Sequence, residues 1–541
     1  MAVDPISLEV FKSLFISVSE EMGVALQRTA YSPNMKERRD FSCAIFDPEA
    51  QMVAQAAHVP VHLGAMPASV RAAIDTFPNS LRPGDMVILN DPYLGGTHLP
   101  DITLVAPVYA DIPASPSGKA GSRGISKRLA GFVANRGHHA DVGGMTPGSL
   151  PLSTELYQEG TIIPPIKLIR GGRLNHEVIQ LICRNSRTPE ERKGDLAAQI
   201  ASTRVGERRL QEIIQRYGND ETQEHMAALL DYSERLTRQA ITRIPDGVYE
   251  VVDYMDDDGL TDQPVPIRVC ITVAGDEITV DFTGTSPQRP GCINAPQAIS
   301  VSACLYVIRC IVGEEAPANQ GCLRPIKIIT PRGTLVNPEP QRGVAGGNVE
   351  TSQRITDVLF SALAQALPEL IPAASQGTMN NLLVGGHDLD RNKPFVYYET
   401  IAGGMGARPT KDGISGIHTH MTNTMNTPVE AFEFAFPMRL KRYAIRRGSG
   451  GRGKYQGGDG LVRDVEFLAP ARVTILSERR KFPPPGFHGG HHGETGENVL
   501  LRGGYEEVHL AGKETLDVEP GDVLSIRTPG GGGWGAPEDD K

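Results

Sequence analysis

Residues 91–144 concentrate side chains that can bind a metal ion or move a proton. The stretch opens D-P-Y-L-G-G-T-H-L-P-D, in which His98 and Asp101 follow a Gly-Gly turn. It closes R-G-H-H-A-D-V-G-G, which contributes His138, His139 and Asp141. Imidazole and carboxylate groups together are the ligands of divalent zinc, manganese or iron, with a position left for substrate. This stretch is therefore the candidate site.

Pro100 lies between His98 and Asp101, which excludes a shared helical face and leaves convergence from a turn. The pair alone is more typical of a turn in which the aspartate accepts backbone amides and the histidine lies at the surface. His138 on a neighbouring strand adds a third ligand, and Asp40, at the start of an expected strand, is a candidate fourth. From spacing alone, a metal site and a plain turn both remain open.

Three of these residues also have catalytic interpretations. Asp40 is placed where a strand edge can present a carboxylate to a cleft. We expect His139 and Asp141 to lie behind the metal ligands, with Asp141 orienting a ligand imidazole.

Other histidines give weaker signals. His418 and His420 alternate on an extended segment and point the same way, so a second metal site is one interpretation and hydrogen bonding within a cleft is the favoured one. His488, His491 and His492 lie in a glycine-rich loop that can bind metal adventitiously, although a structural or exposed loop is the better interpretation.

The sequence around the site predicts strands over residues 85–90, 102–109 and 130–135. Residues 111–128 are rich in Ser, Gly, Pro and basic side chains, which predicts an exposed, mobile hairpin extension. A helix is expected from Asp4-Pro5 to about residue 28, because Asp is a good N-cap and Pro fits the first helical position. Glycines 530–533, beside the single tryptophan, indicate closely packed backbone.

The chain as a whole predicts a mixed α+β, multi-domain protein with a helical insert and β-rich central and C-terminal regions. Helical patterns cover residues 176–218 and 221–244, and strands follow at 248–254, 264–273 and 277–282. We expect an N-terminal α/β region with the metal site (1–245), a β-rich domain (246–342) and a glycine-rich α/β region (343–541). A chain of 541 residues is too long for one ordinary core.

Composition excludes several classes of protein. The formal charge of −10 argues against a general nucleic-acid binder, which needs a basic surface. The seven cysteines form no C-x-x-C pair and indicate a reducing compartment. The sequence shows neither a signal peptide at its N-terminus nor an apolar run long enough for a membrane span, so we expect a cytoplasmic protein.

No segment matches the Walker pattern or the dinucleotide fingerprint, and no serine or cysteine lies in a nucleophile-elbow context. Cys43, within an expected strand, is interpreted as a core residue. The sequence therefore predicts no nucleotide site of its own.

Several motifs, in order along nearly the whole chain, resemble those of the hydantoinase B/5-oxoprolinase family. They are N-D-P-Y-L-G-G-T-H-L-P-D, R-G-H-H-A-D-V-G-G, G-N-V-E-T-S-Q-R, A-A-S-Q-G-T-M-N-N, E-T-I-A-G-G-M-G-A-R, H-M-T-N-T-M-N-T-P-V-E and P-G-G-G-G-W-G. The resemblance implies the B-type component of an ATP-dependent hydrolase acting on a cyclic amide such as a hydantoin, 5-oxoproline or a lactam. It also implies a separate hydantoinase A-type ATPase partner that binds ATP and magnesium, and hence a hetero-oligomer.

In that family a divalent metal lies near the organic substrate, and the motifs carry its ligands onto His98, Asp101 and His138, with Asp40 as a further acidic ligand or near-ligand. Loops around Gly403, Gly404 and Gly406 and around residues 376–381 are expected to offer backbone N–H donors to substrate, beside His418 and His420. Two alternatives remain: the large component of an acetone or acetophenone carboxylase, and a non-catalytic scaffold for the ATPase.

Overall fold

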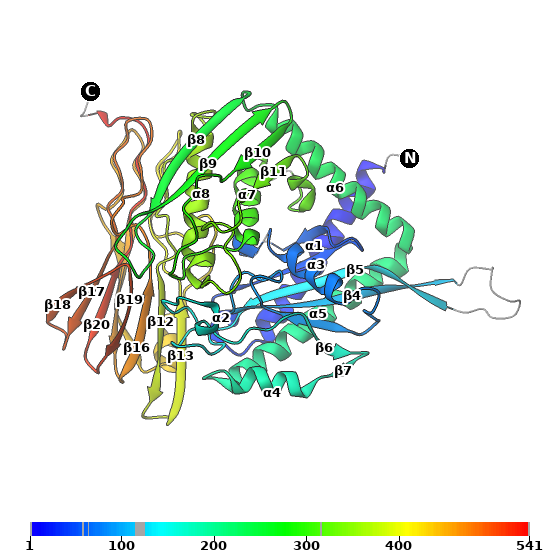
Figure 1. Ribbon diagram of the computed structural model, residues 1–541, viewed down its shortest axis with the longest axis horizontal. Coiled ribbons are helices and arrows are strands. Elements are labelled where there is room, and N and C mark those ends of the chain that lie inside the picture. The colour runs from blue at the N-terminus through cyan, green and yellow to red at the C-terminus, as the bar shows by residue number, and fades with distance from the viewer. Residues whose placement is uncertain (1–2, 57–58, 63, 114–124, 314–315, 539–541) are drawn as a thin grey trace, which may run out of the picture.

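The computed structural model describes residues 3–56, 59–62, 64–113, 125–313 and 316–538. Within that part of the chain the strands form four sheets, accompanied by helices that cover or connect them (Figure 1). The expected mixed α+β class, with a helical insert and β-rich central and C-terminal regions, is confirmed. None of the described helices is long and apolar enough to cross a membrane.

A seven-stranded antiparallel sheet carries the site, with strand order β2-β1-β5-β4-β3-β6-β7. Its strands are β1 (Phe41–Phe46), β2 (Met52–Gln55), β3 (Met86–Leu89), β4 (Asp101–Pro113), β5 (Ile125–His138), β6 (Ile166–Arg170) and β7 (Arg173–Leu174). The predicted strands at 102–109 and 130–135 are the middles of β4 and β5.

Helices bury both faces of this sheet. Alternate residues of β1 show why: Cys43 and Ile45 join a core with α1 (Pro5–Thr29) and α5 (Pro189–Tyr217), whereas Ala44 and Phe46 join a core with α3 (Met66–Thr76). A strand with apolar side chains on both faces must be covered on both. The predicted start of α1 is confirmed, since Asp4 accepts a hydrogen bond from the Ser7 amide at 2.9 Å.

The β4–β5 hairpin extends beyond the sheet (Figure 1). Its described arms end at Pro113 and begin again at Ile125, with Asp111 paired to Lys127. The central part of the expected extension, residues 114–124, lies outside the described residues.

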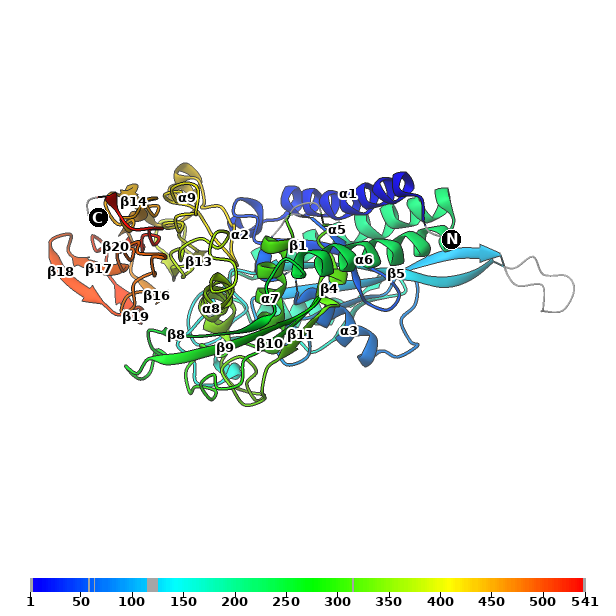
Figure 2. The ribbon, with the colours of Figure 1, turned by 90° about the horizontal axis from the view of Figure 1, so that it is seen from above.

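The helical insert consists of α4 (His176–Arg184), α5 and α6 (Asn219–Ile241), and a one-turn helix α2 (Pro33–Lys36) follows α1. The helical pattern expected over 176–218 is interrupted before Pro189, because proline at the first turn begins a new helix rather than continuing one. Seen from above, α1, α5 and α6 lie together along one side of the sheet (Figure 2).

A second sheet, in the order β11-β10-β9-β8, packs against α7 (Gln297–Val312) and α8 (Ser352–Ala364). Its strands are β8 (Gly247–Met255), β9 (Val265–Ala274), β10 (Glu277–Asp281) and β11 (Ile326–Ile329). Its core also takes in Val59, Val61, Met379 and Met421, which brings it next to the end of the first sheet. Short helical turns are η1 (Pro60–His62), η2 (Leu156–Gln158), η3 (Gln320–Leu323) and the π-helical η4 (Gly347–Thr351).

The last two sheets share one core, which also includes residues of α9 (Val429–Ala435). One sheet has the order β13-β12-β16-β19 and the other the order β14-β15-β20-β17-β18. The strands are β12 (Asn381–Asp388), β13 (Lys393–Glu399), β14 (Met438–Arg446), β15 (Gly460–Phe467), β16 (Ala471–Leu476), β17 (Glu497–Arg502), β18 (Glu506–Leu510), β19 (Lys513–Val518) and β20 (Val523–Arg527).

Candidate metal centre and active site

Three neighbouring strands bring their polar residues to one edge of the first sheet. Asp101 is the first residue of β4 and His138 the last of β5, and the two are direct cross-strand partners. Asp40 immediately precedes β1, and its backbone oxygen accepts a hydrogen bond from the His138 amide at 3.0 Å. Residues far apart in sequence therefore meet because the strands β1, β5 and β4 are adjacent.

The loop between β3 and β4 delivers His98 to the same place. Asn90 donates to the Leu99 carbonyl at 2.7 Å, which fixes the loop near its end. Gly95 has a φ of 90°, and a Cβ on Gly96 would overlap the Asn90 carbonyl, so both positions of the Gly-Gly turn need glycine. The turn expected from the sequence is confirmed.

His98, Asp101 and His138 form a tight triangle. The Nε2 of His98 lies 2.9 Å from Oδ1 of Asp101, and the Nδ1 of His138 lies 3.1 Å from the same oxygen. The two ring nitrogens are 3.2 Å apart. All three side chains are at most 2% exposed. The structure thus brings together the three residues that the sequence placed as metal ligands.

The second oxygen of Asp101 is held by two other side chains. His62 places Nε2 at 3.2 Å from Oδ2, and the Thr97 hydroxyl donates to it at 3.0 Å. Burial by itself raises the pKa of Asp101, but the charges of His98 and His62 and the hydrogen bonds outweigh it, so the pKa lies well below its usual value. Asp101 therefore remains ionised at neutral pH.

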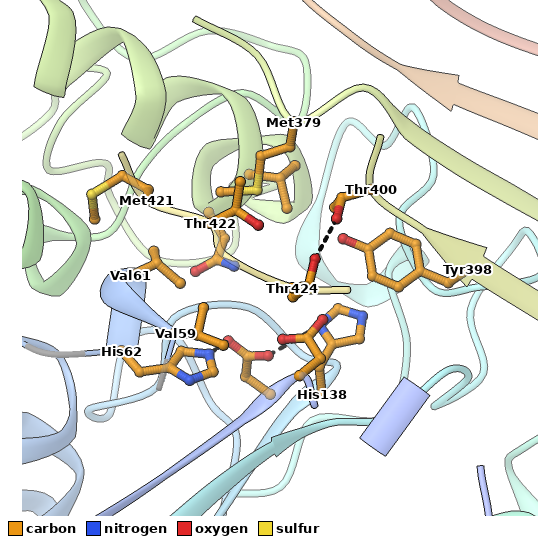
Figure 3. A pocket seen from close by; sticks show the side chains of 14 residues that line it. Val59, Val61, His62, His138, Met379, Tyr398, Thr400, Met421, Thr422 and Thr424 are labelled. Carbon is orange, nitrogen blue, oxygen red and sulfur yellow. Dashed lines mark hydrogen bonds and ion pairs between the residues drawn. The ribbon is translucent and has the colours of Figure 1, made fainter. Parts of the chain in front are cut away.

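A cavity of about 20 Å³ opens beside the triangle. Asp40, His62, Asp101 and His138 line it together with Asn348 and Tyr398. Figure 3 shows His62 and His138 on one side of it and Met379, Met421 and Thr422 on the other. The Tyr398 ring stacks on the His138 ring at 4.6 Å between centroids, which fixes the plane of the imidazole.

The donor set fits a divalent ion. Ligands at about 2.0–2.1 Å from one ion stand about 3 Å from one another, which matches the sides of the triangle. One ligand atom from each of His98, Asp101 and His138 lies within 4.8 Å of the other two. Among the described residues, the Nδ1 of His98, the Nε2 of His138 and the Oδ1 of Asn348 are buried without a hydrogen-bond partner.

His139 and Asp141 lie away from this cavity, which corrects the expectation that Asp141 orients an imidazole. Both Asp141 oxygens accept hydrogen bonds from loop residues, including the Arg187 guanidinium at 2.9 Å. The Nε2 of His139 contacts the Gln199 amide oxygen at 2.8 Å, on α5. Successive side chains at the end of an extended strand face opposite sides, so His139 turns away when His138 faces the site.

Glycines 403, 404 and 406 also differ from the expectation, because their N–H groups are already used within the protein. Gly403 donates to the Ile417 carbonyl at 3.3 Å, Gly404 to the Pro529 carbonyl at 3.0 Å and Gly406 to the Ser375 hydroxyl at 3.2 Å. A Cβ on Gly404 would overlap the backbone of Gly458 and Gly531. These glycines allow close packing of backbone segments; packing of the same kind around residues 530–533 confirms that prediction.

His418 and His420 line a second, larger cavity next to the first. Burial lowers the pKa of His418 to about 3, assisted by the charge of Arg38. Burial also lowers the pKa of His420, although Asp357 opposes the shift. Both rings are therefore neutral at physiological pH.

Sequence reasoning missed His62, Asn348 and Tyr398 as residues of the site. His62 lies in the short turn η1, where its apolar neighbours concealed it. Asn348 lies in η4, a π-helical turn of a kind that is rare and frequent at functional sites, and its Nδ2 is 3.3 Å from Nε2 of His98. The glycines before Asn348 were the available signal, since they predict a break ahead of the helix.

Comparisons with known proteins agree with this geometry. The sequence profile of the family described as Hydantoinase B/oxoprolinase matches residues 4–537. An uncharacterized protein of Methanocaldococcus jannaschii is 42% identical over 99% of this chain and 91% of its own. 5-Oxoprolinase 1 of Arabidopsis thaliana is 40% identical over 98% of this chain, which spans 42% of that longer protein.

A putative D-/L-hydantoinase of Pseudomonas sp. strain NS671, in its B-type component, is 33% identical over 99% of this chain and 90% of its own. Among solved structures, the ATP-dependent caprolactamase of Pseudomonas jessenii superposes with a TM-score of 0.89 and 27% identity, covering 100% of this chain and 93% of that one. An acetone carboxylase shares the fold, with a TM-score of 0.84 and 18% identity over 99% of this chain and 76% of that one. The chain belongs to the hydantoinase B/oxoprolinase family.

Proposed function

We propose that this chain is the substrate- and metal-binding component of an ATP-dependent enzyme that opens a cyclic amide such as a hydantoin, 5-oxoproline or another lactam. The observation that carries the proposal is the buried triangle of His98, Asp101 and His138, with sides of 2.9–3.2 Å, at the edge of a cavity. Relatives named 5-oxoprolinase and D-/L-hydantoinase, and the caprolactamase structure, support this reaction class.

The ATP-binding part lies on a hydantoinase A-type partner. The chain has no Walker pattern, and the Pseudomonas hydantoinase relative is named as one component of a larger enzyme, which supports a hetero-oligomer. The Arabidopsis 5-oxoprolinase contains the matching region within a longer chain, so both arrangements occur among relatives. Coupling to ATP suits this chemistry, because an unactivated amide is a poor electrophile and nitrogen is a poor leaving group.

The metal is zinc, manganese or iron, held by His98, Asp101 and His138 with Asp40 beside them. When bound, a divalent ion polarises a carbonyl or lowers the pKa of a water molecule. His62 and Thr97 hold Oδ2 of Asp101, which leaves Oδ1 to face the two histidines.

Asp40 is the residue we assign to proton transfer. Its carboxylate lines the cavity next to His138 and is 6% exposed, so it can take a proton from an attacking water molecule. His418 and His420 contact the organic substrate from the neighbouring cavity. His139 and Asp141 support the surrounding loops through Gln199 and Arg187.

Co-expression with the ATPase partner tests the proposal. We expect ATP-dependent hydrolysis of a cyclic amide by the complex, and a loss of turnover of at least about a hundredfold in His98→Ala and Asp101→Asn. His387→Ala, an exposed histidine on β12, is the matched control and keeps full activity. Full turnover with retained metal in both site variants would contradict the assignment.

The same experiment separates the alternatives. A bicarbonate-dependent product with a new carboxylate would identify a carboxylase, the activity named for one of the structures with this fold. A chain that binds neither metal nor substrate would identify a scaffold for the ATPase.

A further inference from the structure

A cavity of about 450 Å³ adjoins the metal-binding triangle. It lies between α7, the end of α8 and the segment of residues 414–423. The volume is within the usual range of small-molecule sites, about 300–1,000 Å³. The cavity beside the triangle holds only about 20 Å³, close to the space of one water molecule. A cyclic amide therefore needs the larger cavity for its ring.

Two short segments form a common wall between the cavities. Met421 lines the small cavity, Asn423 the large one and Thr422 both. Val59 and Val61 line the small cavity, and Pro60 between them lines the large one. Figure 3 shows Met421 and Thr422 across the small cavity from His62 and His138. A ring in the large cavity thus has its edge at Thr422, next to the triangle.

The lining of the larger cavity is apolar or uncharged. Tyr306, Phe360 and Leu370 are typical of its walls, and no lysine, arginine, aspartate or glutamate is among the described residues that line it. Both ring nitrogens of His418 and the hydroxyl of Thr419 are buried without a hydrogen-bond partner. The cavity therefore offers a few neutral polar groups to a ligand, and no formal charge.

The nearest buried cations cannot serve a ligand carboxylate, because groups of the protein already engage them. Arg38 donates from Nε to the Met425 carbonyl, from Nη1 to Asn34 and the Tyr398 carbonyl, and from Nη2 to Thr400 and Thr424. These five contacts account for all its N–H groups.

Arg479, behind His420, is engaged as well. It pairs with two carboxylates, those of Asp253 at 2.9 Å and Asp357 at 2.6 Å. Its positive charge is therefore already matched, and neither guanidinium is available to neutralise a negatively charged substrate.

We propose that this larger cavity binds the ring of an uncharged cyclic amide, with its amide edge at Thr422, and discriminates against a ring that carries a carboxylate. The inference rests on the proposed function and narrows it from cyclic amides in general to neutral hydantoins and lactams. A buried carboxylate without a cationic partner loses its hydration and gains no ion pair, which makes 5-oxoproline a poor substrate.

A matched pair of substrates tests the discrimination: 5-oxoproline and its carboxamide share one ring and differ in charge. With the chain in complex with its ATPase partner, we expect kcat/KM for the carboxamide to exceed that for the acid by at least about tenfold. Equal values, or preference for the acid, would overturn the inference while leaving cyclic-amide hydrolysis intact.

Variants of the cavity wall sharpen the test. Leu370 is 53% exposed and lines the cavity, so Leu370→Lys introduces a cation without disturbing the core. We expect it to narrow the ratio between carboxamide and acid several-fold. Leu389→Lys, at an exposed position in the β12–β13 turn, is the control and leaves the ratio unchanged. An unchanged ratio in Leu370→Lys would contradict the assignment of the cavity.

Direct binding distinguishes a failure of this inference from a failure of the proposed function. Ile417→Trp fills part of the cavity from a partly exposed position, without changing a ligand of the triangle. We expect saturation-transfer NMR with the carboxamide to lose its signal in this variant while the metal content stays constant. If no cyclic amide is hydrolysed, the proposed function fails, yet this loss of binding still supports the cavity. Binding that survives Ile417→Trp overturns it.

Discussion

Two buried polar regions of the molecule differ in how their carboxylates are compensated. In the first, Arg354, Arg479 and Lys513 pair with Asp253, Asp357 and Glu478. In the second, Asp101 contacts imidazoles and the Thr97 hydroxyl, with no lysine or arginine in an ion pair with it among the described residues. Both regions are almost completely shielded from water.

The difference separates a structural network from a site. Buried charges are stable when cations and hydrogen bonds satisfy them, as in the first region. The second region leaves ring nitrogens of His98 and His138 unpartnered, and burial lowers the pKa of His138, although Asp40 and Asp101 oppose the shift. A divalent cation would supply the missing positive charge there.

The largest expected effect comes from breaking the paired region. Arg479→Leu leaves Asp253 and Asp357 with reduced compensation, and we expect the free energy of unfolding to fall by about 3–5 kcal/mol. Urea denaturation measures the change. Arg472→Leu, which breaks an exposed pair with Asp517, is the control and costs at most about 1 kcal/mol. Equal effects of the two substitutions would show that the buried network is not structural.

Gly404→Ala tests whether the glycine-rich segments pack or bind ligand. The added Cβ would overlap Gly458 and Gly531, so we expect a loss of about 3 kcal/mol in the free energy of unfolding, visible as a lower thermal midpoint. A variant with unchanged stability and a raised KM would instead support a substrate loop.

His418→Leu tests the neutral character of the larger cavity. The folded pKa of about 3 lies below the unfolded value, so the unfolded state binds more protons and wild-type stability falls as pH drops from about 6.5 to 3. This residue contributes up to about 1.4 kcal/mol per pH unit to that loss. Denaturation at pH 7 and pH 4 measures it, and we expect His418→Leu to lose less stability on acidification. An unchanged pH dependence would indicate that His418 is accessible to solvent.

The smallest effect is expected from His139→Gln. The side chain faces Gln199 rather than the triangle, so metal content and turnover should stay at the wild-type level. Loss of metal in this variant, with His138 intact, would restore His139 to the ligand set.

Sequence alone predicted much of the fold and the convergence of three residues at the candidate site. Strands with clear periodicity were placed well, and the Gly-Gly turn ahead of His98 and Asp101 was predicted correctly because its chemistry is local. The pairing of Asp101 with His138 depends on β4 lying beside β5, which the hairpin pattern indicated.

The remaining parts of the site depend on contacts between distant segments. His62 reaches Asp101 from a turn 39 residues earlier, and Asn348 reaches His98 across 250 residues. Composition and spacing carry no signal for such contacts. The glycines at 403–406 were misassigned for the same reason, since their partners lie at residues 458 and 529–531.

Metal stoichiometry tests the central claim most directly. After chelation, reloading with zinc or manganese and dialysis, elemental analysis should find one ion per wild-type chain and none in Asp101→Asn. The double variant His488→Ala/His492→Ala, which alters the glycine-rich histidine loop, should keep one ion. One ion retained in Asp101→Asn, or lost in the loop variant, would contradict the assignment of the site to His98, Asp101 and His138.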